Sequence, residues 1–199
     1  MKKIMWLAMV GLLIAAPSWL AAQEGGSNYD HASVGIFADY MRFSPGARTT
    51  NFVGFGARAA FNVSHHVSLE GEMNYDFERN FTTICNNCAS TSFSTTRVRP
   101  LTGLFGPKFE TPGPFKFFVT GKLGFLNFTT SSAAVTPGTV GSAISSVGGR
   151  GTHFAMYPGA GFEGFWGPIG LRLEAGDEVY ISNGTFNNLR VTFGPQFRF

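Results

Sequence analysis

The chain has 199 residues, with 15 lysines and arginines against 12 acidic residues, and its formal net charge is +3. Its mean hydropathy is only +0.07, and after the N-terminal segment no apolar run reaches the roughly 18 residues of a spanning helix. A helical membrane protein is therefore excluded. No block of basic residues is present either, so the composition predicts no nucleic-acid partner.

Residues 1–22 have the pattern of a secretory signal peptide. Two lysines precede an apolar run over residues 4–16, and Ala21 and Ala22 provide small residues at the end of the segment. Because the run is too short to span a bilayer, we expect removal of the segment after export. The remaining domain, residues 23–199, then has a net charge of only +1.

Beyond this segment, apolar and polar residues alternate in eight stretches. Each stretch is long enough to cross a bilayer as a tilted strand, and 22 phenylalanines suit a wall in which every second residue faces lipid. The predicted strands cover residues 34–43, 52–63, 67–77, 96–110, 115–128, 152–165, 169–180 and 188–199.

The connections between these stretches alternate in length. Those after the second, fourth and sixth strands are short, and the others are longer. Short periplasmic turns and longer external loops are typical of outer-membrane barrels. We therefore predict an all-β fold, an eight-stranded antiparallel up-and-down transmembrane β-barrel in a bacterial outer membrane. A soluble barrel is the alternative, but the signal peptide and the terminal phenylalanine favour the membrane.

The alternation also predicts which side chains face lipid. In the first strand, the preferred register places Ile36 and Tyr40 outside and Asp39 inside. In the last strand, one face is apolar and is expected to contact outer-membrane lipid. It consists of Leu189, Val191, Phe193, Phe197 and Phe199.

Several short segments carry a family resemblance. They are Phe105-Gly106-Pro107-Lys108-Phe109, Pro114-Phe115, Gly159-Ala160-Gly161-Phe162, Gly170-Leu171-Arg172-Leu173-Glu174 and Phe193-Gly194-Pro195-Gln196-Phe197-Arg198-Phe199. With them the chain resembles the small eight-stranded outer-membrane β-barrel proteins, similar in plan to the transmembrane domain of outer membrane protein A. The resemblance implies that Phe197 and Phe199 form an assembly signal for the outer-membrane barrel assembly machinery. A wall-anchoring role is not implied, because no periplasmic domain follows the last strand.

The inward faces carry balanced charges, with seven acids and seven bases outside the first strand. An eight-stranded barrel is just wide enough to be filled by side chains, and an unpaired buried charge costs about 3–5 kcal/mol. The balance predicts a lumen plugged by salt bridges, and an ion path is the alternative. The predicted network is Arg58, Glu70, Glu72, Lys108, Lys122, Glu163, Arg172, Glu174 and Arg190. Further inward charges are Asp76, Glu78, Glu110, Lys116 and Arg198.

Cys85 and Cys88 form a Cys-Asn-Asn-Cys motif in the second external loop. In an exported chain this spacing predicts a local disulfide, and redox or metal binding is the alternative. A thioredoxin-type redox centre would need a helix start in a βαβ unit, whereas Thr, Ser and Asn surround these cysteines.

Catalytic signals are weak. Lipid A deacylases, which are also eight-stranded barrels, use a His-x-Ser pair, but His153 is followed by Phe154 and Ala155. His65 and His66 are expected to be solvated turn residues rather than metal ligands. We therefore predict neither enzyme activity nor a cofactor.

The predicted function is a structural or surface-interaction role. The polar loop at residues 129–150 could contact an extracellular ligand or serve as a flexible tether. The alternatives are a narrow channel for small solutes or ions and, with less support, a lipid-modifying enzyme of the outer membrane.

Overall fold

The computed structural model describes residues 31–43, 50–84, 93–133, 151–182 and 184–199. The expected signal peptide, both cysteines and most of the loop at residues 129–150 lie outside these described residues. In the described part of the chain, no helix has the length and apolar character needed to cross a membrane.

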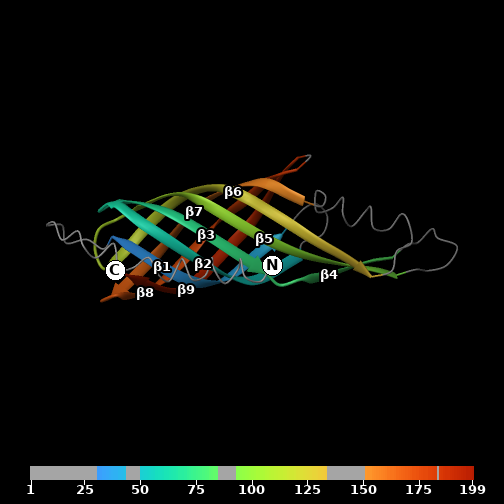
Figure 1. The fold of residues 1–199 in the computed structure, drawn as a ribbon, viewed down its shortest axis with the longest axis horizontal. Coiled ribbons are helices and arrows are strands. Elements are labelled where there is room, and N and C mark those ends of the chain that lie inside the picture. Colours follow the sequence, from blue (N-terminus) through green and yellow to red (C-terminus); the bar gives the residue numbers. More distant parts are fainter. Residues whose placement is uncertain (1–30, 44–49, 85–92, 134–150, 183) are drawn as a thin grey trace, which may run out of the picture.

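Neighbouring strands of the described chain are antiparallel throughout and form a closed barrel (Figure 1). Because β3 and β4 both pair with β5, they occupy one position, and the barrel is eight-stranded. Pairing of β1 with β9 and of β3 with β5 closes it, which confirms the predicted fold class. The strands are β1 Ala32–Phe43, β2 Thr50–Ser64, β3 Val67–Asp76, β4 Arg79–Ile84, β5 Phe93–Glu110, β6 Phe115–Ala133, β7 Gly151–Trp166, β8 Ile169–Ile181 and β9 Thr185–Arg198.

Tight turns and the two ends of the strand series gather at one end of the barrel, which we call the turn end. The amide of Ala32 donates to the carbonyl of Phe199 at 3.0 Å, and the amide of Arg198 donates to the carbonyl of Pro168 at 2.8 Å. Between β7 and β8 the connection is only Gly167-Pro168, and Gly167 has the positive φ of 66° that suits glycine in such a turn. We call the opposite end the loop end.

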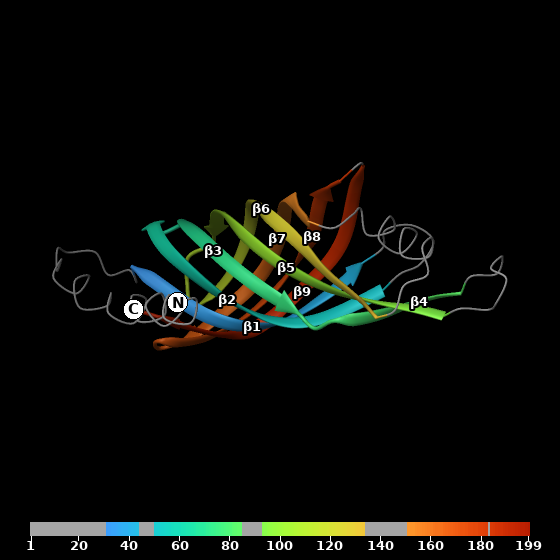
Figure 2. The ribbon, with the colours of Figure 1, turned by 45° about the vertical axis from the view of Figure 1, so that its right-hand side comes forward.

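At the loop end, β4 and the adjoining parts of β5 and β6 project beyond the barrel (Figures 1 and 2). Residues 78–95 were expected to be a loop, and this expectation was wrong for part of the segment. The pairing of β4 with β5 runs from Arg79 with Val98 to Ile84 with Phe93. Backbone hydrogen bonds form this ladder. β4 can therefore pair with β5 without the apolar–polar alternation that a barrel wall needs.

The break between β3 and β4 overturns one predicted orientation. Glu78 was expected to face the lumen, but it lies in this break and its side chain is 52% exposed. Phe77, Glu78 and Arg79 are all exposed in succession, so the two-residue period of the strand is interrupted at this point.

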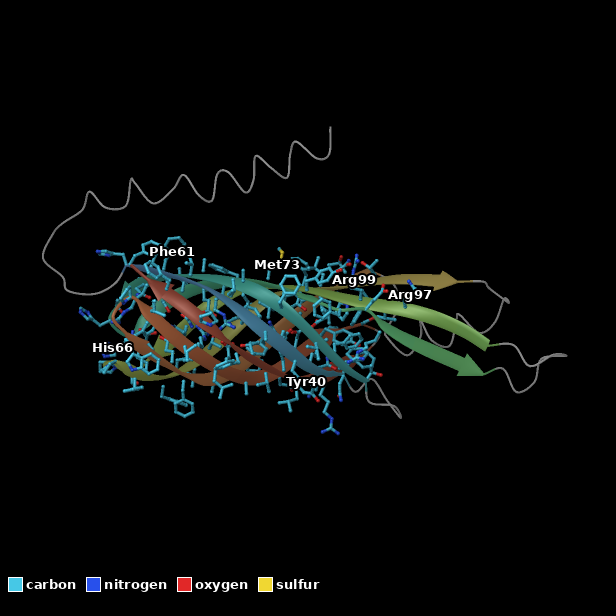
Figure 3. All side chains as sticks on the ribbon, turned by 90° about the horizontal axis from the view of Figure 1, so that it is seen from below. Tyr40, Phe61, His66, Met73, Arg97 and Arg99 are labelled. Carbon is cyan, nitrogen blue, oxygen red and sulfur yellow. The ribbon has the colours of Figure 1, made fainter. Side chains whose placement is uncertain are left out.

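Outside such breaks, the barrel strands bury one face and expose the other. On β2, Phe55 and Phe61 are 57% and 56% exposed, whereas Arg58 between them is 6% exposed. Figure 3 shows Phe61 and Met73 pointing away from the barrel. Large apolar side chains thus cover the outer wall, a pattern typical of strands that face lipid.

Candidate functional site

The lumen contains the nine residues of the predicted charge network, and all nine are buried. They extend from β2, β3, β5, β6, β7, β8 and β9, because the strand period of two sends alternate side chains inward. Direct contacts connect them, and the pairs cross the lumen as well as joining neighbouring strands.

Lys122 lies at the centre of this network. Its Nζ atom is 2.6 Å from Glu70 Oε1, 2.7 Å from Glu72 Oε2 and 2.9 Å from Glu174 Oε1. These three carboxylates lie close enough to one another to hold a metal ion. The ammonium group of Lys122 lies among the same oxygens, however, so the chain supplies its own cation.

Three arginines, Arg58, Arg172 and Arg190, surround the same carboxylates. Arg172 donates from both terminal nitrogens to Glu70, and it also donates to Glu174. Arg58 Nη1 lies 2.8 Å from Glu174 Oε2. In the closed strand order β3 and β8 are opposite one another, so the pair between Glu70 on β3 and Arg172 on β8 spans the lumen.

Arg190 extends the network toward the loop end. Its Nη1 atom is 2.8 Å from Glu72 Oε1, and its Nε atom donates to Asp39 Oδ1 at 3.0 Å. Glu178 Oε2 lies 3.4 Å from Arg190 Nη1, and Glu178 Oε1 accepts a hydrogen bond from Thr102. Glu178 was missed in the sequence, although it has the same strand phase as Glu174.

A second group of charges lies toward the turn end. Lys108 Nζ is 2.6 Å from Glu110 Oε2 and 2.9 Å from Glu163 Oε1. Lys116 pairs with the other oxygen of Glu110. Arg172 Nη1 lies 3.7 Å from Glu163 Oε2 and so connects this group to the central one.

Aromatic rings pack against two of the guanidinium groups. The centre of Arg58 lies 4.2 Å from the Phe37 ring centroid, and that of Arg172 lies 4.0 Å from the Phe118 centroid, which is within cation–π range. Space for Phe37 depends on a glycine, since a Cβ atom at Gly56 would lie 2.3 Å from this ring. The inward glycine therefore allows the ring to lie beneath the arginine.

An apolar cluster fills the lumen on the loop-end side of the charges, and we call it the aromatic layer. The Phe43 ring lies 5.6 Å from Phe128, 5.7 Å from Phe52 and 6.0 Å from Tyr180, measured between centroids. This layer was not predicted, because aromatic residues of the strands were expected to face lipid. Its buried members are Met41, Phe43, Phe52, Val98, Leu104, Leu126, Phe128, Ala155, Tyr157 and Tyr180.

The remaining candidates lie elsewhere. The His153 ring lies against this layer, 6.0 Å from Phe128 and 5.9 Å from Tyr180. Phe197 and Phe199 are 46% and 47% exposed on the outer wall at the turn end. Cys85 and Cys88 lie outside the described residues, so their predicted disulfide stays a prediction.

Comparison with known proteins identifies the fold. No family model and no curated protein matches the chain. Ail, the attachment invasion locus protein of Yersinia pestis, in complex with the heparin analogue sucrose octasulfate, has a TM-score of 0.50 at 14% identity, over 84% of this chain and 96% of that one.

Two other solved barrels are less similar. The Neisserial surface protein NspA has a TM-score of 0.49 at 14% identity, over 88% of this chain and 100% of that one. The barrel domain of Pseudomonas aeruginosa OprF has a TM-score of 0.47 at 13% identity, over 86% and 100%. The likeness to Ail and the closed strand order together show that the chain has the fold of the small eight-stranded outer-membrane β-barrel proteins.

Proposed function

We propose that the protein is an outer-membrane barrel with an ion-tight lumen, which stabilises the envelope and presents its loop end to the exterior. The apolar outer wall supports membrane insertion, since 28 large hydrophobic side chains of the described residues would otherwise face water. In this orientation the turn end faces the periplasm. Recognition of Phe199 by the barrel assembly machinery is part of the same proposal.

The central observation is that ion pairs cross the lumen. Lys122 on β6 contacts carboxylates on β3 and on β8, and Arg172 on β8 contacts Glu70 on β3. A hydrated ion moving through the barrel would have to separate these pairs, which costs several kcal/mol for each charge left buried without a partner. The aromatic layer adds an apolar barrier on the loop-end side of the network.

The loop end supports the second half of the proposal. The β4–β5–β6 projection extends the sheet beyond the wall that would face lipid (Figure 2). A segment placed there would lie in the external medium, where it could contact a ligand or another surface.

Planar-bilayer recording on refolded protein tests the closed lumen. We expect no conductance steps from the wild type after its insertion has been verified by heat-modifiable migration. A variant with Lys122→Ser and Phe43→Ser, which removes the central cation and one ring of the aromatic layer, provides the matched control and should leak. Steady, large conductance from the wild type would overturn the proposal and support a channel.

A further inference from the structure

Four arginines among the described residues lie near the loop end, outside the lumen network. Arg42 on β1, Arg79 on β4 and Arg97 on β5 are exposed, and Arg99 on β5 is half-buried. Glu78 lies 3.5 Å from Arg97 in an exposed pair, and Asp177 on β8 lies two strands from Arg42 at the same level. The four arginines outnumber these two acids, so this part of the loop end has a net positive charge.

The strand period of two places Arg97 and Arg99 on the same face of β5. Arg79 pairs with Val98 and so begins on the opposite face, where its Nε atom donates to the backbone carbonyl of Asn51 at 3.1 Å. Arg99 Nη1 donates to the hydroxyl of Tyr75 at 3.1 Å, and its guanidinium lies 5.1 Å from the Tyr75 ring centroid. These contacts hold Arg99 against the barrel wall, where Figure 3 labels it.

An apolar groove of about 930 Å³ begins below Arg99, and Tyr75 and Leu101 form part of its lining. The groove exists because the outward residues Ala38 and Ala57 are small, whereas their neighbours Phe55 and Met73 are large and exposed. A second hollow of about 950 Å³ shares several lining residues with the first, and it continues along the wall toward the turn end.

We propose that this face binds a phosphate-bearing lipid, with the phosphate held by Arg97 and Arg99 and one acyl chain lying in the groove. Arginine presents a planar fork of donors that matches phosphate oxygens. Arg97 has an exposed pair with Glu78, and Arg99 donates from Nη1 to Tyr75. A cationic rim directly above an apolar groove fits an amphiphile, because each half of such a ligand meets a matching surface. The inference rests on the proposed insertion in a membrane, but not on a closed lumen.

Lipid retention measured by native mass spectrometry tests this inference. The barrel is refolded in phosphatidylcholine nanodiscs that contain small, equal amounts of phosphatidic acid and of diacylglycerol with the same chains. We expect phosphatidic acid to be retained at least about ten-fold more strongly, because each arginine near a membrane surface strengthens binding to anionic lipid. The double substitution Arg97→Gln and Arg99→Gln should remove this preference, and Arg97→Lys with Arg99→Lys should keep part of it.

Matched controls separate the two halves of the site. Arg198→Gln removes one positive charge at the turn end and should leave retention unchanged. Ala57→Phe fills the groove and should lower retention about ten-fold, whereas Ala175→Phe, on the outer face of β8, should not. Heat-modifiable migration confirms folding of every variant.

Several outcomes would overturn the inference. These are equal retention of the two lipids, a preference that survives the Arg97 and Arg99 substitutions, and an equal loss in Arg198→Gln, which would indicate general charge attraction. If millimolar inorganic phosphate displaced the lipid, the acyl chain would contribute nothing to binding, and the part of the proposal that concerns the groove would be wrong. Because conductance is measured separately, a leaking barrel that still retains the lipid would contradict only the closed lumen.

Discussion

The charge network and the aromatic layer fill the same lumen by different physical means. In the network each group depends on specific partners, and Lys122 alone contacts three carboxylates. In the aromatic layer, Phe43 contacts three rings without any hydrogen bond. Removal of one network residue therefore leaves other charges buried without a partner, whereas removal of one ring only loses contacts and leaves space.

The largest effect is expected at the centre of the network. Lys122→Met should lower the free energy of unfolding by about 4–5 kcal/mol, because three buried carboxylates lose their shared cation. Urea titration of the barrel in lipid vesicles measures it. Lys116→Met is the matched control, because Lys116 is 16% exposed and its ion pair among the described residues is with Glu110, so its cost should be much smaller. Equal losses of unfolding free energy at Lys122 and Lys116 would contradict a special role for Lys122 at the centre of the network.

A smaller effect is expected in the aromatic layer. Phe43→Ala should cost about 3 kcal/mol, at the low end for a buried phenylalanine, because water entering from the loop end can fill part of the space. The same urea titration measures it, with the exposed Phe55→Ala as the control for loss of a ring. A cost above that of Lys122→Met would reverse the order of the two regions.

A double-mutant cycle measures the coupling within the network. Arg172→Ala and Glu70→Gln should show a coupling energy of about 2 kcal/mol, because each substitution leaves the other group without its bidentate partner. Additive costs would mean that this pair does not act as a unit, and the description of the lumen as one network would fail.

The smallest effect belongs to an ion pair outside the lumen. Glu78→Gln removes the partner of Arg97, but both side chains are more than half exposed. The expected change in unfolding free energy is at most about 0.5 kcal/mol, because water and salt screen the pair. A cost of several kcal/mol would show that burial is not what distinguishes the network.

The alternation of side chains made the barrel and the inward position of most lumen charges predictable. Asp39 is buried and Ile36 is exposed, as the preferred register of the first strand required. A two-residue period identifies faces, but it contains no information on how far one strand is shifted against another. The contact between Arg58 and Glu174, 116 residues apart, could therefore not be predicted.

Three of the features that escaped prediction did so for identifiable reasons. Phe43 and Tyr180 share the inward phase of polar residues, yet an aromatic side chain in a barrel strand was taken as a sign of lipid contact. β4 lies in a segment without alternation, so no period marked it. Glu78 lies where the phase changes, and only the path of the backbone shows this break.

The seam between β1 and β9 has a consequence for the order of events during assembly. Asp39 on β1 and Arg190 on β9 are 151 residues apart, and Arg58 on β2 and Thr192 on β9 are 134 apart. These partners meet only when the last strand docks onto the first, which is slow because a long stretch of chain must be closed. Until then the inward charges need water, so an open intermediate must keep its interior hydrated. Loss of water from the lumen and pairing of β1 with β9 therefore occur together in one late step. After this step, a shift in the register of any single strand would separate several ion pairs at once.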